Sequence, residues 1–319
     1  MSLYLGVDTS AYTTSLCLVS STGEVVGEVR KVLTVPHGQQ GLRQSEAVFQ
    51  HIQNLPTLAK DLREQLGHGW KVAAVAASTA PRPQPGSYMP VFVPGSSFGL
   101  AYAHMAGVPF YELSHQENHI LSGMHTSGMP SSSRFIAIHL SGGTTELMEV
   151  AAGDGGRMGI SILGATGDLH AGQFVDRVGV ALGLPFPAGP ALEKLALGSD
   201  GAVTVPAVHK HGQLSFSGPL TALLAHAGKA EPGAIARGCL ECIGRALIKW
   251  IRWAEAETRC TELLLVGGVA ANQLIREMLS ARLPHWKLYF APPRYSTDNA
   301  LGAALYARQA HSLSFHGQN

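Results

Sequence analysis

LYLGVDTSAYTTSLCLVSS, residues 3–21, has the same pattern as RFIAIHLSGGTTELMEVAA, residues 134–152. Each segment combines an apolar strand, a small polar turn with a Thr-Thr pair, and a second strand of alternating apolar residues. We interpret the pair as a weak internal duplication, with one such hairpin opening each of two lobes. Because helical periodicity follows both hairpins, the sequence predicts an α/β protein whose two lobes of mixed sheet and helix enclose a cleft.

Length and composition agree with two lobes. The chain has 319 residues, and 45% hydrophobic against 14% charged residues is enough to build large buried cores. We place the N-terminal lobe at residues 1–130 and the C-terminal lobe at residues 131–296, with SGMPSSS, residues 127–133, as a hinge or surface loop. The last helix, at about residues 297–312, is expected to pack near the N-terminal lobe.

The net charge of +1 excludes a strong general attraction to nucleic acid, so contact with RNA would need a local basic surface or a partner. No run of about 18 apolar residues is present, and MSLYLGVDTS lacks a secretory pattern, so we expect no membrane partner. Cys239 and Cys242 form a C-x-x-C without a second pair, which favours free or buried thiols over zinc. These features predict a cytoplasmic protein.

LSHQENHILSGM, residues 113–124, places His115 and His119 four positions apart. On a helix, side chains at this spacing project from the same face. Two such imidazoles can share one divalent ion at about 2.0–2.1 Å. In a chain with 15 His the pair alone is weak, so a metal site requires a third ligand.

Glycine-rich turns follow two predicted strands, as LSGG at residues 140–143 and LVGG at residues 265–268. Such turns present backbone N–H groups that suit phosphate. Each turn alone is also explained by the need for glycine in a tight turn. Two of them, in separate halves of the sequence, favour a nucleotide held between the lobes.

Seven motifs occur in a characteristic order: GVDTS, HQENH, LSGGTTEL, GQFVDRVGVALGLPFPAGP, LSFSG, VGGVAAN and STDNALGAALYA. From about residue 3 to residue 308 the chain resembles the tRNA threonylcarbamoyladenosine transferase family, formerly described as O-sialoglycoprotein endopeptidase. The resemblance implies the actin-like, sugar-kinase and Hsp70 ATPase fold, with two ribonuclease H-like lobes. It also implies transfer of a threonylcarbamoyl group from an adenylate to N6 of adenosine 37 in tRNAs that read ANN codons.

The same resemblance implies site residues, cofactors and partners. One divalent metal, iron or zinc, would be held by His115, His119 and Asp298, and no catalytic residue is assigned. Two imidazoles and one oxygen leave positions open on the ion, which could polarise the carbamoyl carbonyl. Partner subunits of the same pathway and tRNA are also implied. The residues implied for ATP or threonylcarbamoyl-adenylate are Leu140, Ser141, Gly142, Gly143, Thr144, Asp176, Gly189 and Asn272.

Each of these residues also has an ordinary structural interpretation. Asp298 and Asn272 suit helix N-termini, where capping and the helix dipole favour them. Asp176 could pair with Arg177 or Lys194. The joint occurrence of the motifs in this order favours nucleotide and metal binding.

The chain departs from the family at three places. Tyr12 and Thr13 replace an acidic pair in the first turn, and Thr144 replaces a histidine. APRPQPGSYMP, residues 80–90, replaces a glycine-rich stretch and is stiffer. These departures leave open a paralogue that binds nucleotide and metal without transfer and acts as a scaffold or regulator.

Two further functions are weaker alternatives. A metallopeptidase is disfavoured because Gln116 stands where HExxH carries its base, and Glu117 would point to another side of the helix. A sugar kinase on the same fold lacks evident phosphate and base signatures, although Asp8 lies where a strand-end carboxylate could hold a metal-bound water.

Overall fold

The structure is a computed structural model that describes residues 2–10, 12–35, 42–130, 134–153 and 157–316. Its internal contacts divide the chain into two compact units. Unit 1 contains Met1–Thr126, Ala152–Met158 and Thr297–Asn319. Unit 2 contains Ser127–Ala151 and Gly159–Ser296. Arg157 contacts other residues of unit 1, because its guanidinium donates to the Tyr306 hydroxyl and to the Glu112 carbonyl.

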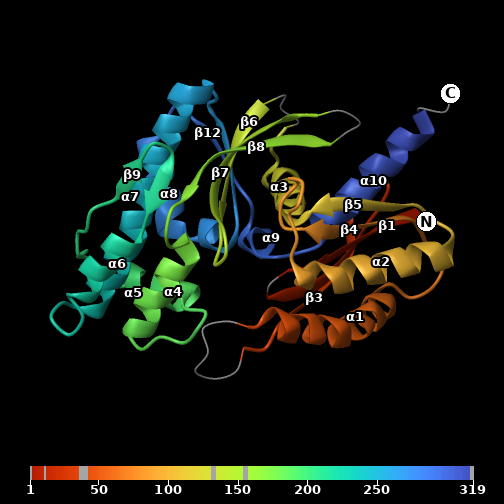
Figure 1. Ribbon diagram of the computed structural model, residues 1–319, viewed down its shortest axis with the longest axis horizontal. Coiled ribbons are helices and arrows are strands. Elements are labelled where there is room, and N and C mark those ends of the chain that lie inside the picture. The colour runs from red at the N-terminus through yellow and green to blue at the C-terminus, as the bar shows by residue number, and fades with distance from the viewer. Residues whose placement is uncertain (1, 11, 36–41, 131–133, 154–156, 317–319) are drawn as a thin grey trace. The chain divides into compact units, whose positions relative to one another are not determined.

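Unit 1 is built on a five-stranded sheet in the order β3-β2-β1-β4-β5 (Figure 1). The strands are β1 (Ser2–Thr9), β2 (Thr13–Val19), β3 (Val25–Val32), β4 (Lys71–Ala80) and β5 (Phe110–Ser114). The first three strands are antiparallel, whereas β4 runs parallel to both β1 and β5. The helices are α1 (Gln44–Leu66), η1 (Pro90–Phe92), α2 (Val93–Ala106), α3 (His115–Ser127) and α10 (Leu301–His316).

Alternation along β1 decides which helices cover each face of this sheet. Leu5 and Val7 belong to a core that also contains residues of α1 and α2. Gly6 points the other way, where a Cβ atom would stand 2.2 Å from the carbonyl oxygen of Ala300, so only glycine lets the start of α10 approach this closely. Because successive side chains alternate, Asp8 lies on the same face as Gly6.

Unit 2 is built on a seven-stranded sheet in the order β12-β11-β6-β7-β8-β10-β9. The strands are β6 (Arg134–Leu140), β7 (Thr145–Ala152), β8 (Met158–Thr166), β9 (Val208–Lys210), β10 (Gln213–Ser215), β11 (Glu262–Val266) and β12 (Lys287–Phe290). The helices are α4 (Ala171–Ala181), α5 (Gly189–Leu197), α6 (Ser217–Leu224), α7 (Pro232–Thr258), η3 (Gly268–Ala271), α8 (Gln273–Arg282) and α9 (Pro293–Ser296). The long helix α7 supplies many residues of the core, including the fully buried Trp250.

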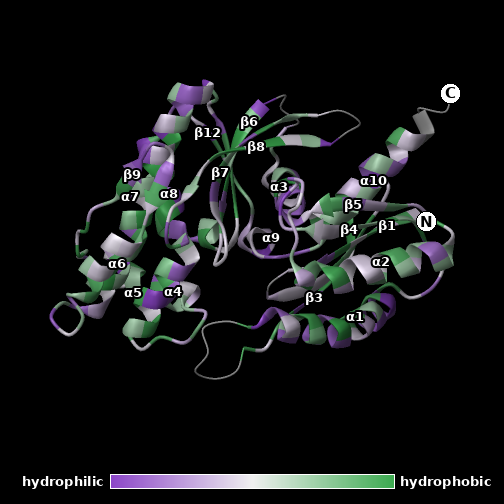
Figure 2. Ribbon diagram, viewed as in Figure 1, coloured by the Kyte–Doolittle hydropathy of each residue, from purple (hydrophilic) through white to green (hydrophobic). Residues whose placement is uncertain are grey.

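The two sheets share one arrangement of five strands. In unit 1 the hairpin β1–β2 is followed outward by β3 on one side and by β4 and β5 on the other. In unit 2 the hairpin β6–β7 is followed by β8 on one side and by the parallel strands β11 and β12 on the other. This repetition confirms the predicted internal duplication and the α/β fold class. In Figure 2, the strands of both sheets are largely hydrophobic, whereas α1 carries both kinds of residue along its length.

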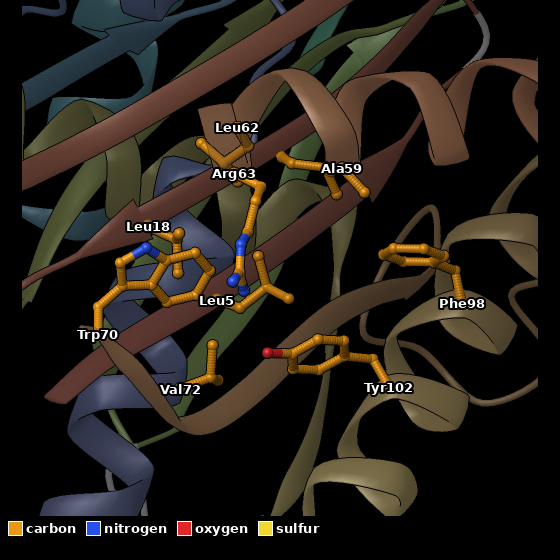
Figure 3. Close-up of a pocket in the computed structure, with 10 residues that line it drawn as sticks. Leu5, Leu18, Ala59, Leu62, Arg63, Trp70, Val72, Phe98 and Tyr102 are labelled. Atoms are coloured by element: carbon orange, nitrogen blue, oxygen red, sulfur yellow. The ribbon is translucent and has the colours of Figure 1, made fainter. Parts of the chain in front are cut away.

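Unit 1 also holds a small apolar cavity of about 60 Å³ between its sheet, α1 and α2 (Figure 3). Leu5, Leu62 and Phe98 line it, and the guanidinium of Arg63 lies over the ring of Trp70, another lining residue. None of the three predicted metal ligands lines this cavity. We therefore regard it as imperfect packing under α1 rather than as the functional site.

None of the four cysteines, all of which lie in the described residues, forms a disulfide, and Cys239 and Cys242 are buried thiols, in agreement with the prediction for this pair. Burial raises the pKa of Cys242 to about 11, although Arg245 and Lys249 act in the opposite direction, so this thiol stays protonated near neutral pH. Among the helices formed by the described residues, none combines the length and apolar character needed to cross a bilayer.

Candidate functional site

Helix α3 begins directly at the predicted metal-binding histidines because a capping box precedes them. The Glu117 carboxylate accepts from both the backbone N–H and the hydroxyl of Ser114, each at 2.7 Å, and the Glu117 N–H donates back to that hydroxyl at 3.2 Å. This reciprocal pair satisfies N–H groups at the helix start. Glu117 therefore fixes the helix start, a role unrelated to the base of a peptidase.

The segment that carries Asp298 is joined to α3 by buried amide side chains. Asn118 is fully buried, and its amide group donates to the Asn299 carbonyl at 2.6 Å while its amide oxygen accepts from the Ala303 N–H at 2.8 Å. The Asn299 amide oxygen accepts from the Ser122 hydroxyl and from the first N–H of α10, each at 3.0 Å. These contacts hold residues 298–303 in place against α3.

The structure brings the three predicted metal ligands together, and we call His115, His119 and Asp298 the metal cluster. One ligand atom from each lies within 4.8 Å of the other two. Asp298 Oδ1 stands 3.2 Å from His119 Nε2 and 3.6 Å from His115 Nε2. Ligands that surround an ion tetrahedrally at about 2.0–2.1 Å stand about 3.3 Å apart. The donor set and its spacing therefore fit a divalent cation.

The imidazoles and carboxylates at the metal cluster shift the pKa values of His115 and Asp298. Burial disfavours the imidazolium of His115, but the charge of Asp8 and hydrogen bonds to Asp298 and Asp8 outweigh it and raise the pKa of His115 to about 10. Burial also disfavours the carboxylate of Asp298, but hydrogen bonds and charges of His115 and His119 hold its pKa well below the usual range. The two carboxylates therefore favour a positive charge at this position, which a divalent ion would supply.

Another buried histidine, His51 of α1, supports the end of β1 beside the metal cluster. Its Nε2 lies 2.7 Å from the Ser10 carbonyl, which can only accept, so Nε2 carries the proton and Nδ1 accepts from the Thr14 hydroxyl at 2.8 Å. The Ser10 hydroxyl donates to Asp298 Oδ2 at 2.6 Å. Burial lowers the pKa of His51, although the Ser10 carbonyl and nearby carboxylates oppose this. The sequence reasoning did not predict any role for His51, Ser10 or Asn118.

The predicted nucleotide residues 140–144 form the turn between β6 and β7, here called the glycine turn. The Ser141 N–H donates to the Thr144 carbonyl at 2.8 Å, and the Gly172 N–H of α4 donates to the Ser141 carbonyl at 3.1 Å. Gly142 and Gly143 face open space, since a Cβ atom on either would meet no atom within 4 Å. The glycine turn is therefore braced from beneath by α4, with two accessible glycines at its tip.

The second glycine-rich stretch lies beside the first, because β11 pairs with β6 in parallel and both strands end at the same edge of one sheet. Gly267 has φ of +96°, and a Cβ atom there would stand 2.2 Å from the Leu140 carbonyl oxygen. Both turns lie in unit 2, within the predicted C-terminal lobe, although they come from separate halves of the sequence. They are therefore neighbours on one sheet and do not by themselves indicate a nucleotide held between lobes.

The remaining predicted nucleotide residues also lie in unit 2. Asp176 of α4 accepts from the Ala188 N–H at 2.7 Å, next to Gly189 at the start of α5, and does not pair with Arg177 or Lys194 among the described contacts. Burial raises the pKa of Asp176, although this hydrogen bond lowers it. Asn272 is the N-cap of α8, where its amide oxygen accepts from the Ile275 N–H at 3.1 Å. The structure therefore shows Asn272 in the capping role that its sequence position suggested.

Two sheets with the same strand order define the actin-like, sugar-kinase and Hsp70 ATPase class of fold, and known structures agree. The chain is similar to the activator of 2-hydroxyisocaproyl-CoA dehydratase from Clostridium difficile with bound ADPNP. That match has a TM-score of 0.56 and 15% identity, and it covers 99% of this chain and 97% of the other. A ROK family glucokinase from Streptomyces griseus matches with a TM-score of 0.54 and 15% identity, covering 96% and 99% of the two chains.

The family is shown by sequence. The family model "TsaD: tRNA N6-adenosine threonylcarbamoyltransferase" matches residues 25–305. A tRNA N6-adenosine threonylcarbamoyltransferase from Thermus thermophilus is 34% identical over 316 residues, which cover 98% of this chain and 94% of the relative. The chain belongs to this family of transferases, which confirms the resemblance found in its motifs.

Proposed function

We propose that this chain transfers a threonylcarbamoyl group from threonylcarbamoyl-adenylate to N6 of adenosine 37 in tRNA, in a reaction that depends on a divalent metal. The metal cluster is the observation that carries the proposal. His119 and Asp298 are 179 positions apart in the sequence, yet their ligand atoms lie 3.2 Å from each other. Family membership supports the reaction, and the cluster supports its dependence on iron or zinc.

The residues of unit 1 would hold the ion and keep part of its coordination sphere open. His115, His119 and Asp298 are one carboxylate and two imidazoles, a set that leaves room for oxygen atoms of the substrate. When bound, the ion supplies Lewis-acid polarisation of a carbonyl group. The hydroxyl of Ser10 and the carboxylate of Asp8 orient two of these ligands.

The residues of unit 2 would bind the adenylate. The N–H groups at the tip of the glycine turn suit phosphate oxygens, because two adjacent glycines let a ligand approach the backbone. The carboxylate of Asp176 is an acceptor for a ribose hydroxyl, and the N-terminus of α8 behind Asn272 favours negative charge. ATP would use the same contacts.

A second candidate is a paralogue that binds nucleotide and metal but does not transfer. The first turn favours it, because Tyr12 and Thr13 replace the acidic pair of the family pattern. Thr13 is the first residue of β2 and is 7% exposed, and the Tyr12 carbonyl accepts from the Leu33 N–H. Neither residue places a carboxylate at this turn.

Replacement of a cell's own enzyme by this chain tests the proposal. Mass spectrometry of tRNA nucleosides should detect threonylcarbamoyladenosine with the parent chain and none with Asp298→Ala. Ser78→Ala, which changes a buried hydroxyl of β4, is the control and should retain modification. Absence of the modified nucleoside with the parent chain, despite nucleotide and Zn²⁺ binding in vitro, would favour the paralogue. Transfer by metal-free Asp298→Ala would refute the role of the ion.

Nucleotide binding is tested separately by Gly143→Ala. An added Cβ would meet no protein atom within 4 Å, so the fold should be unaffected. Calorimetric titration with ATP should show binding weakened by about tenfold or more if the backbone approaches phosphate there, a loss of about 1.4 kcal/mol. Gly201→Ala, also without a neighbour within 4 Å, is the control. Equal affinity in all three chains would remove the glycine turn from the proposal.

The proposal includes partner subunits of the same modification pathway and a cytoplasmic location. The net charge of +1 supports a partner that supplies basic surface for tRNA, and four cysteines without a disulfide support a reducing compartment. Affinity purification of the tagged chain from its host cytosol, followed by mass spectrometry, would identify such partners.

A further inference from the structure

The carboxylate of Asp8 lies at the end of β1 and contacts the metal cluster without belonging to it. Asp8 is fully buried, and its Oδ1 stands 2.9 Å from His115 Nδ1. A carboxylate can only accept, so His115 donates from Nδ1. His115 Nε2, on the opposite side of the ring, is the atom that faces Asp298 at 3.6 Å.

The second oxygen of Asp8 leaves this buried carboxylate only partly satisfied by hydrogen bonds. Oδ2 is buried and has no hydrogen-bond partner among the described residues. A buried carboxylate that is only partly satisfied is costly unless a positive charge stands close to it. A cation in the metal cluster, acting through the ring of His115, would provide that charge.

We propose that Asp8 is a positioning residue of the metal site: it holds His115 in the tautomer and ring orientation that present Nε2 to the ion. The inference rests on the proposed function, because it assumes that the metal cluster binds an ion. A histidine that donates its second ring N–H to a carboxylate is fixed in tautomer and becomes a better ligand. Asp8 therefore sets the affinity and geometry of the site without touching the ion.

Ser10, the residue directly after β1, orients a second ligand of the metal cluster. Its hydroxyl donates to Asp298 Oδ2 at 2.6 Å, which leaves Oδ1 towards the two imidazoles. The Ser10 backbone is in turn held by His51 at 2.7 Å. One end of β1 thus orients two of the three ligands, which come from α3 and from the segment before α10.

Zn²⁺ binding by the purified full chain tests the inference, with competition against a chromophoric chelator as the measurement. Asp8→Ala should weaken binding about 10- to 100-fold, the range typical of lost outer contacts. Asp8→Asn should restore it to within about threefold of the parent, because the amide oxygen still accepts from Nδ1–H. With Co²⁺ as the probe, the visible spectrum should change in Asp8→Ala and not in Thr258→Val, which removes a buried hydroxyl of α7 in unit 2.

Equal Zn²⁺ affinity and an unchanged Co²⁺ spectrum in Asp8→Ala would overturn the role of Asp8, provided that His119→Ala weakens binding. If His119→Ala also binds Zn²⁺ as the parent does, the metal cluster and the proposed function fail together. Should Asp8→Ala not fold, ¹⁵N-histidine spectra of the parent with Zn²⁺ decide the matter. A proton on His115 Nδ1 supports the inference, and a proton on Nε2 refutes it.

Discussion

Replacement of Asn118 should loosen the contact between α3, which carries two predicted metal ligands, and the segment that carries the third. The Asn118 side chain makes hydrogen bonds of 2.6 and 2.8 Å to the backbone of the segment that carries Asp298. In Asn118→Ala the Asn299 carbonyl and the Ala303 N–H would lose buried partners. Each orphaned group costs about 1–3 kcal/mol, so the contact between α3 and the start of α10 should be weakened by about 2–6 kcal/mol in total.

The same change should weaken metal binding. An ion joins ligands from α3 and from the segment before α10, so its binding must restore the geometry that Asn118 no longer fixes. If half of the cost is met from the binding energy, about 1–3 kcal/mol is lost, which corresponds to an affinity about 5- to 150-fold lower.

Hydrogen exchange and Zn²⁺ titration would measure the two effects. Peptides that cover residues 298–306 should exchange faster in Asn118→Ala, and Zn²⁺ should partly restore protection. Asn272→Ala is the control, since Asn272 is also a buried asparagine but caps α8 in unit 2, where it accepts from the Ile275 N–H. Unchanged exchange and unchanged Zn²⁺ affinity in Asn118→Ala would show that these hydrogen bonds do not hold the metal cluster together.

Three further predictions concern other parts of the fold. Burial lowers the pKa of His51 below 6.5, so its contribution to stability is complete above pH 6.5 and is lost as pH falls through the folded-state pKa. The free energy of unfolding in urea, measured from pH 8 to 5, should therefore depend less on pH in His51→Gln. Gly302→Ala would place a Cβ 2.0 Å from the α3 backbone and should destabilise by about 1–3 kcal/mol in thermal unfolding, whereas Gly201→Ala should not. Asp168 accepts from the Ser215 hydroxyl and from two N–H groups at the start of α6, so Asp168→Asn should speed hydrogen exchange of α6 about tenfold, and equal exchange would refute this anchoring.

Local periodicity was sufficient to predict the two hairpins and the pairing of His115 with His119. Strand alternation and helical spacing are properties of short segments, so they can be read from neighbouring residues. Asp298 is different, because only the order of motifs connected it with histidines 179 positions earlier. The spacing of a single segment contains no information on such a contact.

The supporting residues were missed for the same physical reason. Asn118, Ser10 and His51 act through contacts that exist only after α1, α3 and α10 have packed around the end of β1. Asn118 did give a weak signal in the sequence, since asparagine is unfavourable in a helix interior unless its side chain has a specific partner. Asp176 shows the converse, because a charge expected to form an ion pair accepts a backbone N–H instead.

The return of α10 to the first sheet has a consequence for synthesis on the ribosome. The start of α10 packs against β1 at Gly6, and almost all of unit 2 is translated between the two. The face of the first sheet that α10 covers therefore stays exposed until some 300 residues have been synthesised. During this period the nascent chain is most exposed to chaperone binding.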